Sequence, residues 1–418
     1  MSEGLSKQTS AEWGLGGLKG PRVMLAHDWL CGLRGGERVL SEIAEEAVRG
    51  GAEITGLLTM FDDGKPLTPV LDRIERLCSG LGRLPGASTA LRRHLLPFYP
   101  LAVAQLSRKL GRAHRVKAVD LVISTSSAAV KGLEMPLAVE RGGGGRVPHL
   151  SYIHTPARYL WSQAEQYARG SMVRRVGLAA FGPGLRRWDA ATARLPDMLL
   201  ANSAHTARLI KEVWGRESRV VHPGVATEFF TPFTGGDAGA TNAASGGRRW
   251  LVVSALEPYK RVDIAIRAAA AAGRALVVVG RGTQELYLRS IAGPMVTFAG
   301  RVDEEGLRSL YRESELLLHP QVEDFGMSAV EAQACGLPVV ALGSGGALET
   351  VMHGVSGVHF QEQTVASILS GVEACAAAIT AGTLSPAACV AQASKFSRGA
   401  FAAGLTAAVA EVLGTGRS

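Results

Sequence analysis

The sequence predicts an α/β fold in which two domains, each with a mostly parallel sheet, follow one another along the chain. The first observation is length, because 418 residues are too many for one ordinary core. The second is a series of short apolar runs separated by helical segments, which is typical of parallel strands covered on both faces. The third is a break in this series at 231–249, a stretch rich in Gly, Ala and Thr that we interpret as a linker.

The apolar runs mark the expected strands. In the first half they lie at 22–26, 53–58, 119–124, 149–153, 197–201 and 219–223, and in the second half at 250–255, 274–280, 295–300, 315–320, 338–342 and 357–360. Helical segments separate most of these runs, so both halves predict the same α/β architecture. We therefore expect a disordered tail at 1–20, a first domain at 21–230, a linker at 231–249 and a second domain from 250 to 395.

The overall composition is that of a globular protein, with 47% hydrophobic and 20% charged residues. The five cysteines form no CxxC pattern, which favours a reducing compartment and argues against a structural zinc site. No apolar stretch approaches the roughly 20 residues that a membrane-spanning helix needs. The first 20 residues also lack the apolar core of a signal peptide. We therefore expect a cytoplasmic protein.

The whole chain has a formal net charge of +8, and part of the positive charge is concentrated in one segment. Between residues 92 and 117 there are seven basic residues and no acidic one: Arg92, Arg93, Arg108, Lys109, Arg112, Arg115 and Lys117. The simpler interpretation is a solvated helix face. The functional alternative is contact with an anionic membrane surface or an anionic acceptor, because apolar residues are interleaved with the cations. A nucleic-acid partner is not expected, since no recognition motif accompanies the charge.

In the stretch 322–351, Glu323 and Glu331 lie eight positions apart, and the pattern predicts a helix between two breaks. Ser328 and Glu331 form an S-x-x-E pattern, which predicts a capping box at a helix N-terminus. Gly336 fits the position just past the helix, and a short buried strand follows. A purely structural interpretation is a loop, a helix and a strand. The alternative is a ligand site, because a helix N-terminus suits phosphate and a carboxylate beside it can accept hydrogen bonds from hydroxyls.

Polar residues follow many of the expected strands. In open α/β sheets, ligands lie outside the carboxyl ends of the strands, so the residues at these positions are informative. They are His27, Asp28, Ser124, His154 and Asn202 in the first half, and Ser254, Gly280, His319 and Gly343 in the second. Each could be an ordinary strand-end residue. As a set they predict a polar cleft between two facing domains.

Several motifs in order along residues 22–413 resemble the family-4 glycosyltransferases. They are "HDWLCGLRGGERVL", "SYIHTPARYLW", "LLANSAHTARLI", "VHPGVATEFF", "VVSALEPYKRVDIAI", "VVVGRG", "VTFAGRVDEEGL" and "HPQVEDFGMSAVEAQACGLPVVALGSGGALETV". The last of these matches the E-x7-E signature of that family. The resemblance implies the GT-B fold, with two facing Rossmann-like domains and a cleft between them. It also implies that residues 396–418 form a C-terminal helix that crosses back to the first domain.

The same resemblance implies a binding site for a nucleotide-sugar donor. Glu331 would hold the ribose hydroxyls, and Glu323 would face the donor sugar or its leaving phosphate. Four backbone N–H groups would bind sugar hydroxyls and phosphate, those of Phe325, Gly326, Met327 and Ser328.

Further donor contacts are implied on both halves of the chain. Lys260 matches the family's diphosphate-binding lysine, and Arg261 is the candidate for a second cation because Ala255 stands where the family often has arginine. The remaining candidates are glycines of two turns whose backbone would approach the nucleotide: Gly35, Gly36, Gly280 and Gly282.

His154 matches the histidine that contacts the donor sugar in related enzymes, and its simpler role is that of a locally bonded strand-end residue. Asp28, Arg158 and Trp161 are the candidates for the acceptor side. We assign catalytic roles to His154, Lys260 and Glu323.

The resemblance implies transfer of a hexose from a nucleotide sugar to a glycan or lipid-linked acceptor, with retention at the anomeric carbon. The motif "SALEPYKRVD" resembles bacterial polysaccharide mannosyltransferases, so GDP-mannose is the first choice of donor and a UDP-sugar the second. No DxD-type acidic cluster follows a strand, so we expect neither a metal nor a cofactor. Two alternatives remain. One is a dehydrogenase, although the first βαβ unit lacks GxGxxG. The other is a catalytically silent protein that binds a sugar nucleotide in a polysaccharide assembly.

Overall fold

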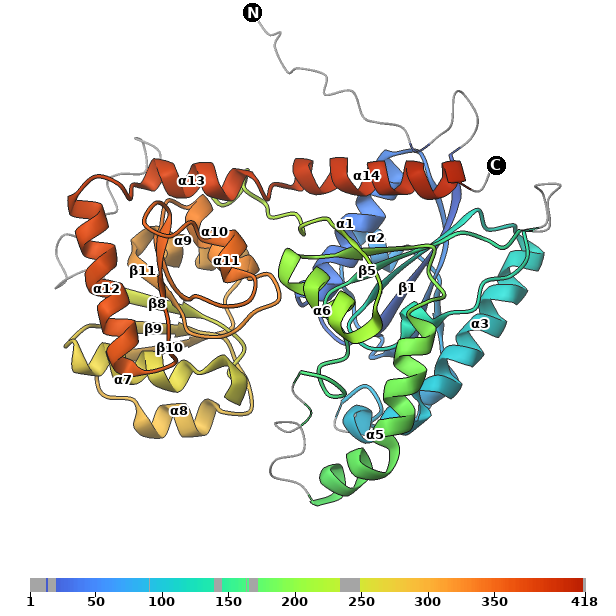
Figure 1. Ribbon diagram of the computed structural model, residues 1–418, viewed down its shortest axis with the longest axis horizontal. Coiled ribbons are helices and arrows are strands. Elements are labelled where there is room, and N and C mark those ends of the chain that lie inside the picture. Colours follow the sequence, from blue (N-terminus) through green and yellow to red (C-terminus); the bar gives the residue numbers. More distant parts are fainter. Residues whose placement is uncertain are drawn as a thin grey trace, which may run out of the picture. The chain divides into compact units, whose positions relative to one another are not determined.

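The computed structural model of the chain describes residues 13, 20–89, 91–138, 145–162, 164, 172–233 and 249–415. Nearly all of the tail expected at 1–20 and of the linker expected at 231–249 lies outside these residues. The chain divides into two compact units, and Figure 1 labels many of their helices and strands. The first unit holds Met1–Val221 and Phe401–Ser418, and the second holds His222–Ala400.

The first unit is built on a seven-stranded parallel sheet with strand order β3-β2-β1-β4-β5-β6-β7. The strands are β1 (Arg22–Leu30), β2 (Glu53–Asp62), β3 (Arg76–Cys78), β4 (Leu121–Ser126), β5 (His149–Ile153), β6 (Met198–Ala201) and β7 (Arg219–Val220). The apolar pattern predicts all of them except β3, which is too short to form an apolar run.

Helices cover both faces of this sheet. Their bounds are α1 (Gly35–Arg49), α2 (Pro69–Asp72), α3 (Tyr99–Val116), α5 (Met172–Thr192), α6 (Ala204–Trp214) and α14 (Arg398–Thr415), with short 3-10 helices η1 (Gly80–Arg83), η2 (Leu91–His94), η3 (Leu96–Phe98) and η4 (Val130–Gly132). The side chains of β1 alternate between two cores: Val23 and Leu25 pack with α1 and α14, whereas Met24 and Ala26 pack with α3. Both faces are therefore buried, which explains the continuous apolar runs in the sequence.

Trp13 is the described part of the segment that we expected to be a disordered tail, and it is packed. Its side chain is 5% exposed and belongs to the core beneath α1 and α14. The indole Nε1 donates to Thr406 Oγ1 at 3.1 Å, and the backbone N–H donates to the carbonyl of Gly50 at 2.9 Å. The expectation of a disordered tail is therefore wrong at this residue, because a large aromatic side chain finds a buried site between two helices.

The second unit has a six-stranded parallel sheet with strand order β10-β9-β8-β11-β12-β13. The strands are β8 (Arg249–Val253), β9 (Leu276–Val279), β10 (Val296–Gly300), β11 (Ser314–His319), β12 (Val339–Leu342) and β13 (Gly357–Phe360). The helical elements are η6 (Pro258–Lys260), α7 (Val262–Ala271), α8 (Glu285–Ile291), α9 (Glu304–Glu313), α10 (Met327–Ala334), α11 (Ala347–Thr350), α12 (Val365–Thr380) and α13 (Pro386–Ser394).

Strand β8 shows the same two-sided burial as β1. Trp250 and Val252 pack into a core with α7 and α12, while Leu251 packs into a core with α9 and α10. Val225 and Phe230 also belong to this second core, so the first unit ends earlier than the boundary that we expected at 230.

Every strand pair within each sheet is parallel, so the carboxyl ends of the strands share one edge of that sheet. Most of the expected strand-end residues follow a strand and lie along this edge, whereas His27 and Asp28 lie inside β1 and Ser124 lies inside β4. Within the described ranges, no helix combines the length and the apolar character that crossing a membrane requires.

Candidate active site

The second unit brings Lys260 and Glu323 together, as neighbours in space that are 63 residues apart in the chain. Lys260 ends the 3-10 helix η6, which follows β8, and its ammonium group forms an ion pair with Glu323 Oε1. The lysine side chain is 8% exposed and that of Glu323 is 20% exposed, so the pair is largely but not fully removed from water. The ammonium also lies 4.9 Å from the ring centre of Tyr259, where the aromatic face favours a cation.

The loop that carries Glu323 packs directly against the glycine-rich turn at 343–346. The carbonyl of Glu323 accepts from the N–H of Gly346 at 2.8 Å. A Cβ added to Gly346 would lie 2.4 Å from Phe325 Cα, and one added to Gly345 would lie 2.3 Å from Glu323 O. The glycines are therefore needed because two backbone segments meet without room for side chains. They position Glu323 through its own backbone.

Helix α10 begins without a side-chain cap, and the predicted capping box is wrong. The N-cap residue is Gly326, with a left-handed φ of 98°, so Ser328 lies inside the first turn instead of preceding it. No acceptor among the described residues is recorded for the N–H groups of Gly326, Met327 and Ser328. A helix end of this kind presents N–H donors and the positive end of the helix dipole to an anion.

Phe325 and Glu331, two more of the predicted donor residues, have buried side chains. The Phe325 ring is 3% exposed and lies 5.4 Å from the ring of Phe396, so only its backbone is left for a ligand. Glu331 is 5% exposed, and its Oε2 accepts from the hydroxyl of Tyr311 at 2.9 Å. That hydrogen bond takes the place of the predicted bond from Glu331 to the helix N-terminus. The ribose role of Glu331 stays a prediction.

Arg261 and the turn at 280–282 lie beside η6 in different surroundings. The Arg261 guanidinium is bound to the carboxylate of Asp263, with Nε 3.1 Å from Oδ1, so its charge already has an intramolecular partner. A Cβ on Gly280 would lie 1.9 Å from the carbonyl oxygen of Ser254, and one on Gly282 would lie 2.3 Å from that of Leu256. These glycines allow the turn after β9 to touch the loop after β8.

Two more polar residues lie beside Glu323: His319, which the sequence indicates only as a strand-end residue of a polar cleft, and Gln321, which was not predicted. His319, the last residue of β11, accepts at Nδ1 from Gln321 Nε2 at 3.2 Å, and the same amide nitrogen lies 3.4 Å from Glu323 Oε1. Burial lowers the pKa of His319 to about 4, so the ring is neutral near pH 7. His319 Nε2 and Gln321 Oε1 are buried and have no hydrogen-bond partner among the described residues. The H-x-Q-x-E spacing after a strand is the signal that could have identified them.

In the first unit the glycine turn lies against two histidines. Gly35 and Gly36 are the first residues of α1, and a Cβ on Gly36 would lie 3.4 Å from His27 Cε1 and 3.5 Å from His154 Nε2. His154 is half-buried, with its carbonyl held by the Asn202 side chain at 3.0 Å. The structure therefore brings together the predicted turn and His154. His27 is fully buried, and this burial lowers its pKa to about 4.

Asp28 is enclosed, and its surroundings do not support the predicted acceptor role. Its carboxylate is 0% exposed and accepts four backbone hydrogen bonds, from the N–H groups of Ser127, Ala128, Ala129 and Val130 at 2.7–2.9 Å. These donors surround the start of η4, so Asp28 fixes the loop after β4. A carboxylate with this many backbone donors has a structural task.

Trp161 and Arg158, the other predicted acceptor residues, are half-buried. The indole Nε1 of Trp161 donates to Asp189 Oδ2 at 2.8 Å, and Trp214 Nε1 donates to the same oxygen at 2.8 Å. Asp189 Oδ1 is paired with the ammonium of Lys131 at 2.6 Å. Trp161 is thus anchored by a buried ion pair, which fixes the loop that contains both predicted residues.

Two family models match adjoining parts of this chain. The model described as "Glycosyltransferase Family 4" matches residues 33–229, and the one described as "Glycosyl transferases group 1" matches residues 238–376. The first lies within unit 1 apart from its last residues, and the second lies within unit 2. Each compact unit is therefore covered for most of its length by one model.

Curated relatives match a smaller part of the chain. The D-inositol 3-phosphate glycosyltransferase of Mycolicibacterium gilvum is 35% identical over 187 residues, which are 40% of this chain and 42% of that protein. The enzyme of the same name from Mycobacterium bovis is 35% identical over 180 residues, which are 38% of this chain and 37% of that protein. The match thus spans about two fifths of the length of these relatives.

Solved structures similar to this chain cover nearly all of it. Sucrose-phosphate synthase from Thermosynechococcus elongatus has a TM-score of 0.72 at 17% identity, covering 94% of this chain and 100% of its own. Anabaena HepE in complex with UDP-glucose has a TM-score of 0.65 at 20% identity, covering 94% and 99%. At these identities the likeness concerns the fold. Together with the two family models, it shows that the chain belongs to the family-4 glycosyltransferases and has the GT-B fold.

Proposed function

We propose that this chain transfers a hexose from a nucleoside-diphosphate sugar to a hydroxyl group of a glycan or lipid-linked acceptor. The observation that carries the proposal is the Lys260–Glu323 pair beside the uncapped start of α10 in the second unit. A cation, a carboxylate and helix N–H donors at the carboxyl edge of one parallel sheet suit a diphosphate and the hydroxyls of a sugar. The UDP and UDP-glucose complexes of HepE support a nucleotide-sugar donor.

In this proposal the bond between the anomeric carbon and the leaving phosphate oxygen breaks with its electron pair on that oxygen, and the acceptor hydroxyl oxygen bonds to the carbon while its proton passes to the departing phosphate. Negative charge grows on the departing diphosphate, so groups that stabilise this charge lower the barrier. In this proposal Lys260 provides a cation for the diphosphate, and the start of α10 provides N–H donors. Glu323 accepts from the donor sugar's hydroxyls and does not attack the sugar. His154 is kept as a donor-sugar contact on its motif alone, and retention follows from the family resemblance.

GDP-mannose is our first choice of donor, and a UDP-sugar is the second. The decisive experiment is a thermal-shift panel of GDP, UDP and their sugars, because a ligand at about 100 times its Kd stabilises the folded state by about 2.7 kcal/mol. A donor that shifts the melting temperature is then tested for transfer and hydrolysis by the pure protein and by Lys260→Met. Binding without turnover in the wild-type protein would favour the alternative of a sugar-nucleotide-binding scaffold.

We propose that transfer needs no metal ion, because Lys260 and the start of α10 supply the positive charge that a metal would otherwise bring to the diphosphate. Adding EDTA should leave the transfer rate nearly unchanged. A loss beyond about tenfold that Mg²⁺ or Mn²⁺ restores would contradict this part of the mechanism.

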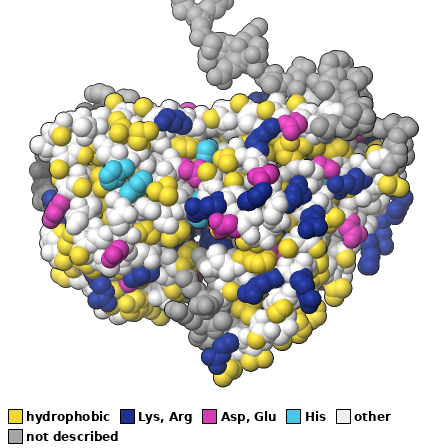
Figure 2. Space-filling model, viewed as in Figure 1, with side chains coloured by type: hydrophobic (Ala, Val, Ile, Leu, Met, Phe, Trp, Pro, Cys, Tyr) yellow, Lys and Arg dark blue, Asp and Glu magenta, His cyan; other side chains and the backbone are white. Residues whose placement is uncertain are grey.

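We also propose that the first unit contacts an anionic membrane surface through α3 from the cytoplasmic side. Figure 2 shows Lys and Arg side chains gathered on the viewed face of this unit. Phe98 and Leu101, at the start of α3, are exposed at 50% and 62%, and the cations of α3 follow in the second half of the same helix. Of the basic residues, Lys117 is paired with Glu53 and Arg92 lies 4.8 Å from the ring centre of Trp29, so these two contribute less than we expected from the sequence. Co-sedimentation with anionic vesicles at low and high salt tests this contact.

A further inference from the structure

A cavity in the first unit lies between η1 and α3, at the β3 edge of the sheet. It has a volume of about 390 Å³ and is lined by Gly80, Arg83, Gln105, Arg108, Lys109 and Arg112. The four α3 residues follow an i, i+3, i+4, i+7 spacing, which places them on one helix face. Strand β3 is at the edge of the sheet, two strands away from β1, which leads to the glycine turn. The cavity is therefore separate from the polar residues that follow the central strands.

The structure shows no acidic partner within the described ranges for the four basic residues of this cavity. Among the described residues, no ion pair or hydrogen bond to a carboxylate is recorded for Arg83, Arg108, Lys109 or Arg112. The acidic residues near this edge are already engaged: Asp62 and Asp72 are both bound to Arg76, with Asp62 Oδ1 at 3.3 Å from its Nη1. Neither of these two described carboxylates is paired with a cation of the cavity.

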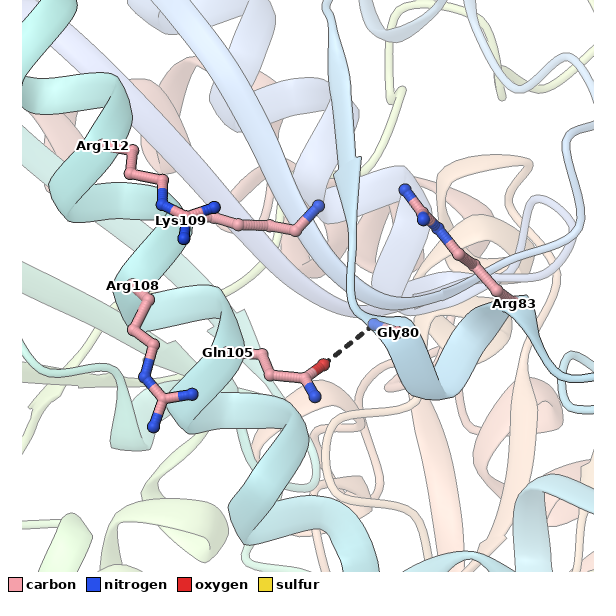
Figure 3. A pocket seen from close by; sticks show the side chains of 6 residues that line it. All are labelled: Gly80, Arg83, Gln105, Arg108, Lys109 and Arg112. Carbon is pink, nitrogen blue, oxygen red and sulfur yellow. Dashed lines mark hydrogen bonds between the residues drawn. The ribbon is translucent and has the colours of Figure 1, made fainter.

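The side chains are arranged around the cavity instead of being spread over the helix. Figure 3 shows Lys109, from α3, and Arg83, from η1, pointing toward one another from opposite sides. Two like charges that face each other repel, and an anion between them removes this repulsion. Arg112 lies next to Lys109 on the helix, whereas Arg108 points away from Arg83.

The wall of the cavity is held by an uncharged contact. Gln105 Oε1 accepts from the N–H of Gly80 at 2.9 Å, which fixes the amide and ties η1 to α3. A Cβ on Gly80 would lie 3.1 Å from that oxygen, so glycine permits the close approach. The amide NH₂ of Gln105 remains as a further donor, and the cavity therefore presents cations and donors without a carboxylate acceptor.

We propose that this cavity binds a phosphomonoester group, held by Arg83, Lys109 and Arg112 with Gln105 as a neutral donor. A phosphomonoester carries about −1.5 to −2 charges near pH 7 and has three strong acceptor oxygens, so it matches several converging donors better than a carboxylate does. One guanidinium group can donate two hydrogen bonds to two oxygens of the same phosphate, and the lysine adds a point charge. The site does not depend on sugar transfer, and its ligand is either a soluble phosphorylated molecule or a lipid headgroup.

The test uses one phosphomonoester in two settings. The soluble arm titrates the full chain with glycerol 3-phosphate at low ionic strength and follows binding by calorimetry. The membrane arm measures co-sedimentation with phosphatidylcholine vesicles that contain phosphatidic acid, against vesicles matched in surface charge with phosphatidylglycerol. Saturable binding in the first arm assigns a soluble ligand. Binding in the second arm alone, with a preference for phosphatidic acid, assigns a lipid headgroup.

Matched variants separate a built site from diffuse charge. Lys109→Gln and Arg83→Gln should each weaken binding at least tenfold, and Gln105→Leu should weaken it severalfold without a change of charge. The control is Arg115→Gln, which removes one charge from the same helix outside the cavity and should change affinity less than twofold. Equal losses in Arg115→Gln and Lys109→Gln, or no saturable binding of the wild-type protein in either arm, would overturn the proposal. Circular dichroism confirms that each variant is folded.

Discussion

The two units each contain a buried lysine–carboxylate pair, and the atoms around the two pairs differ. In the first unit, the side chains of Lys131 and Asp189 are 1% and 0% exposed, and both oxygens of Asp189 are used. Oδ1 accepts from the lysine, and Oδ2 accepts from two indole N–H groups, those of Trp161 and Trp214. The ammonium also lies 4.8 Å from the ring centre of Trp214. This pair is closed, since each charge is enclosed by partners of the protein itself.

The pair in the second unit is open by comparison. Lys260 and Glu323 are 8% and 20% exposed, and the polar atoms beside them, His319 Nε2 and Gln321 Oε1, have no partner among the described residues. Buried polar groups are nearly always hydrogen-bonded, so a local group of exceptions indicates atoms reserved for a ligand. The difference teaches that burial of an ion pair does not itself mark a functional site. The atoms beside Lys260 and Glu323 that have no partner within the described ranges are a feature on which our proposed donor site rests.

The closed pair should produce the largest effect on stability. Asp189→Asn leaves the ammonium of Lys131 buried without a counter-charge, so we expect the free energy of unfolding to fall by about 3–5 kcal/mol. The matched control is Glu212→Gln, which removes one partner of an exposed pair with Arg208 and should cost no more than about 1 kcal/mol. Denaturant titration measures both values. A loss below about 1 kcal/mol in Asp189→Asn would show that the two tryptophans suffice without the charge.

The open pair should affect activity more than stability. Lys260→Met keeps most of the apolar stem and removes the cation, so we expect turnover of the nucleotide sugar to fall by about 10²–10³-fold. Glu323 is partly exposed and can be hydrated, so the loss of stability should be smaller than in Asp189→Asn. Steady-state kinetics and denaturant titration of the same preparation measure the two effects. The distinction between the pairs fails if Lys260→Met unfolds as easily as Asp189→Asn while its turnover is unchanged.

The sequence predicts most of the fold because burial on both faces of a sheet leaves a direct trace, a continuous apolar run. Strand β3 (Arg76–Cys78) leaves no such trace, since three residues at an edge need not be apolar. Trp13 shows another limit, because its partner Thr406 lies 393 residues away and no local pattern relates them. The spacing of apolar residues along a segment cannot predict that a single side chain packs against a residue far away in the sequence.

The candidate site was predictable by residue type but not by partner. The motifs indicate Lys260 and Glu323, yet their ion pair depends on the packing of two loops. The capping box at Ser328 fails because the left-handed φ of Gly326 starts the helix two residues earlier, and only the three-dimensional loop reveals this. Asp28 follows the apolar run at 22–26 and is therefore expected at a strand end, but the structure places it inside β1, and the loop that it binds lies about a hundred residues away in the sequence.

Acid should destabilise the first unit more than the second, because the first unit holds two histidines with a strongly lowered pKa and the second holds one. Burial lowers the pKa of His27 to about 4 and that of His149 to about 3 in the first unit, and that of His319 to about 4 in the second. A lowered pKa means that the unfolded chain binds the proton first, below about pH 6.5. Stability therefore falls as the pH drops from 6.5 toward the folded pKa, by up to about 1.4 kcal/mol per pH unit for each histidine.

The measurement for this prediction is the free energy of unfolding between pH 7.5 and pH 5. At pH 5 the loss from one such histidine is on the order of 2 kcal/mol. In His149→Gln the free energy of unfolding should fall less steeply between pH 6.5 and pH 5. In His94→Gln, a change at an exposed position, it should fall as steeply as in the wild-type protein. Identical slopes for the wild-type protein and His149→Gln would show that the buried ring is not the group that titrates.

The smallest expected effect tests whether the backbone positions the open pair. A Cβ on Gly346 would lie 2.4 Å from both Cα and O of Phe325, and these backbone atoms cannot move aside as a flexible side chain would. We therefore expect Gly346→Ala to lower the free energy of unfolding by about 1–3 kcal/mol. It should also weaken nucleotide-sugar binding, because the new Cβ would push apart the two backbone segments and shift the N–H that binds the carbonyl of Glu323. Gly293→Ala is the control, since its Cβ meets nothing within 4 Å and the substitution should be neutral or stabilise by about 0.4–1 kcal/mol. If Gly346→Ala loses stability but binds the nucleotide sugar with full affinity, the turn does not position Glu323. The ion pair with Lys260 alone would then hold the Glu323 side chain in place.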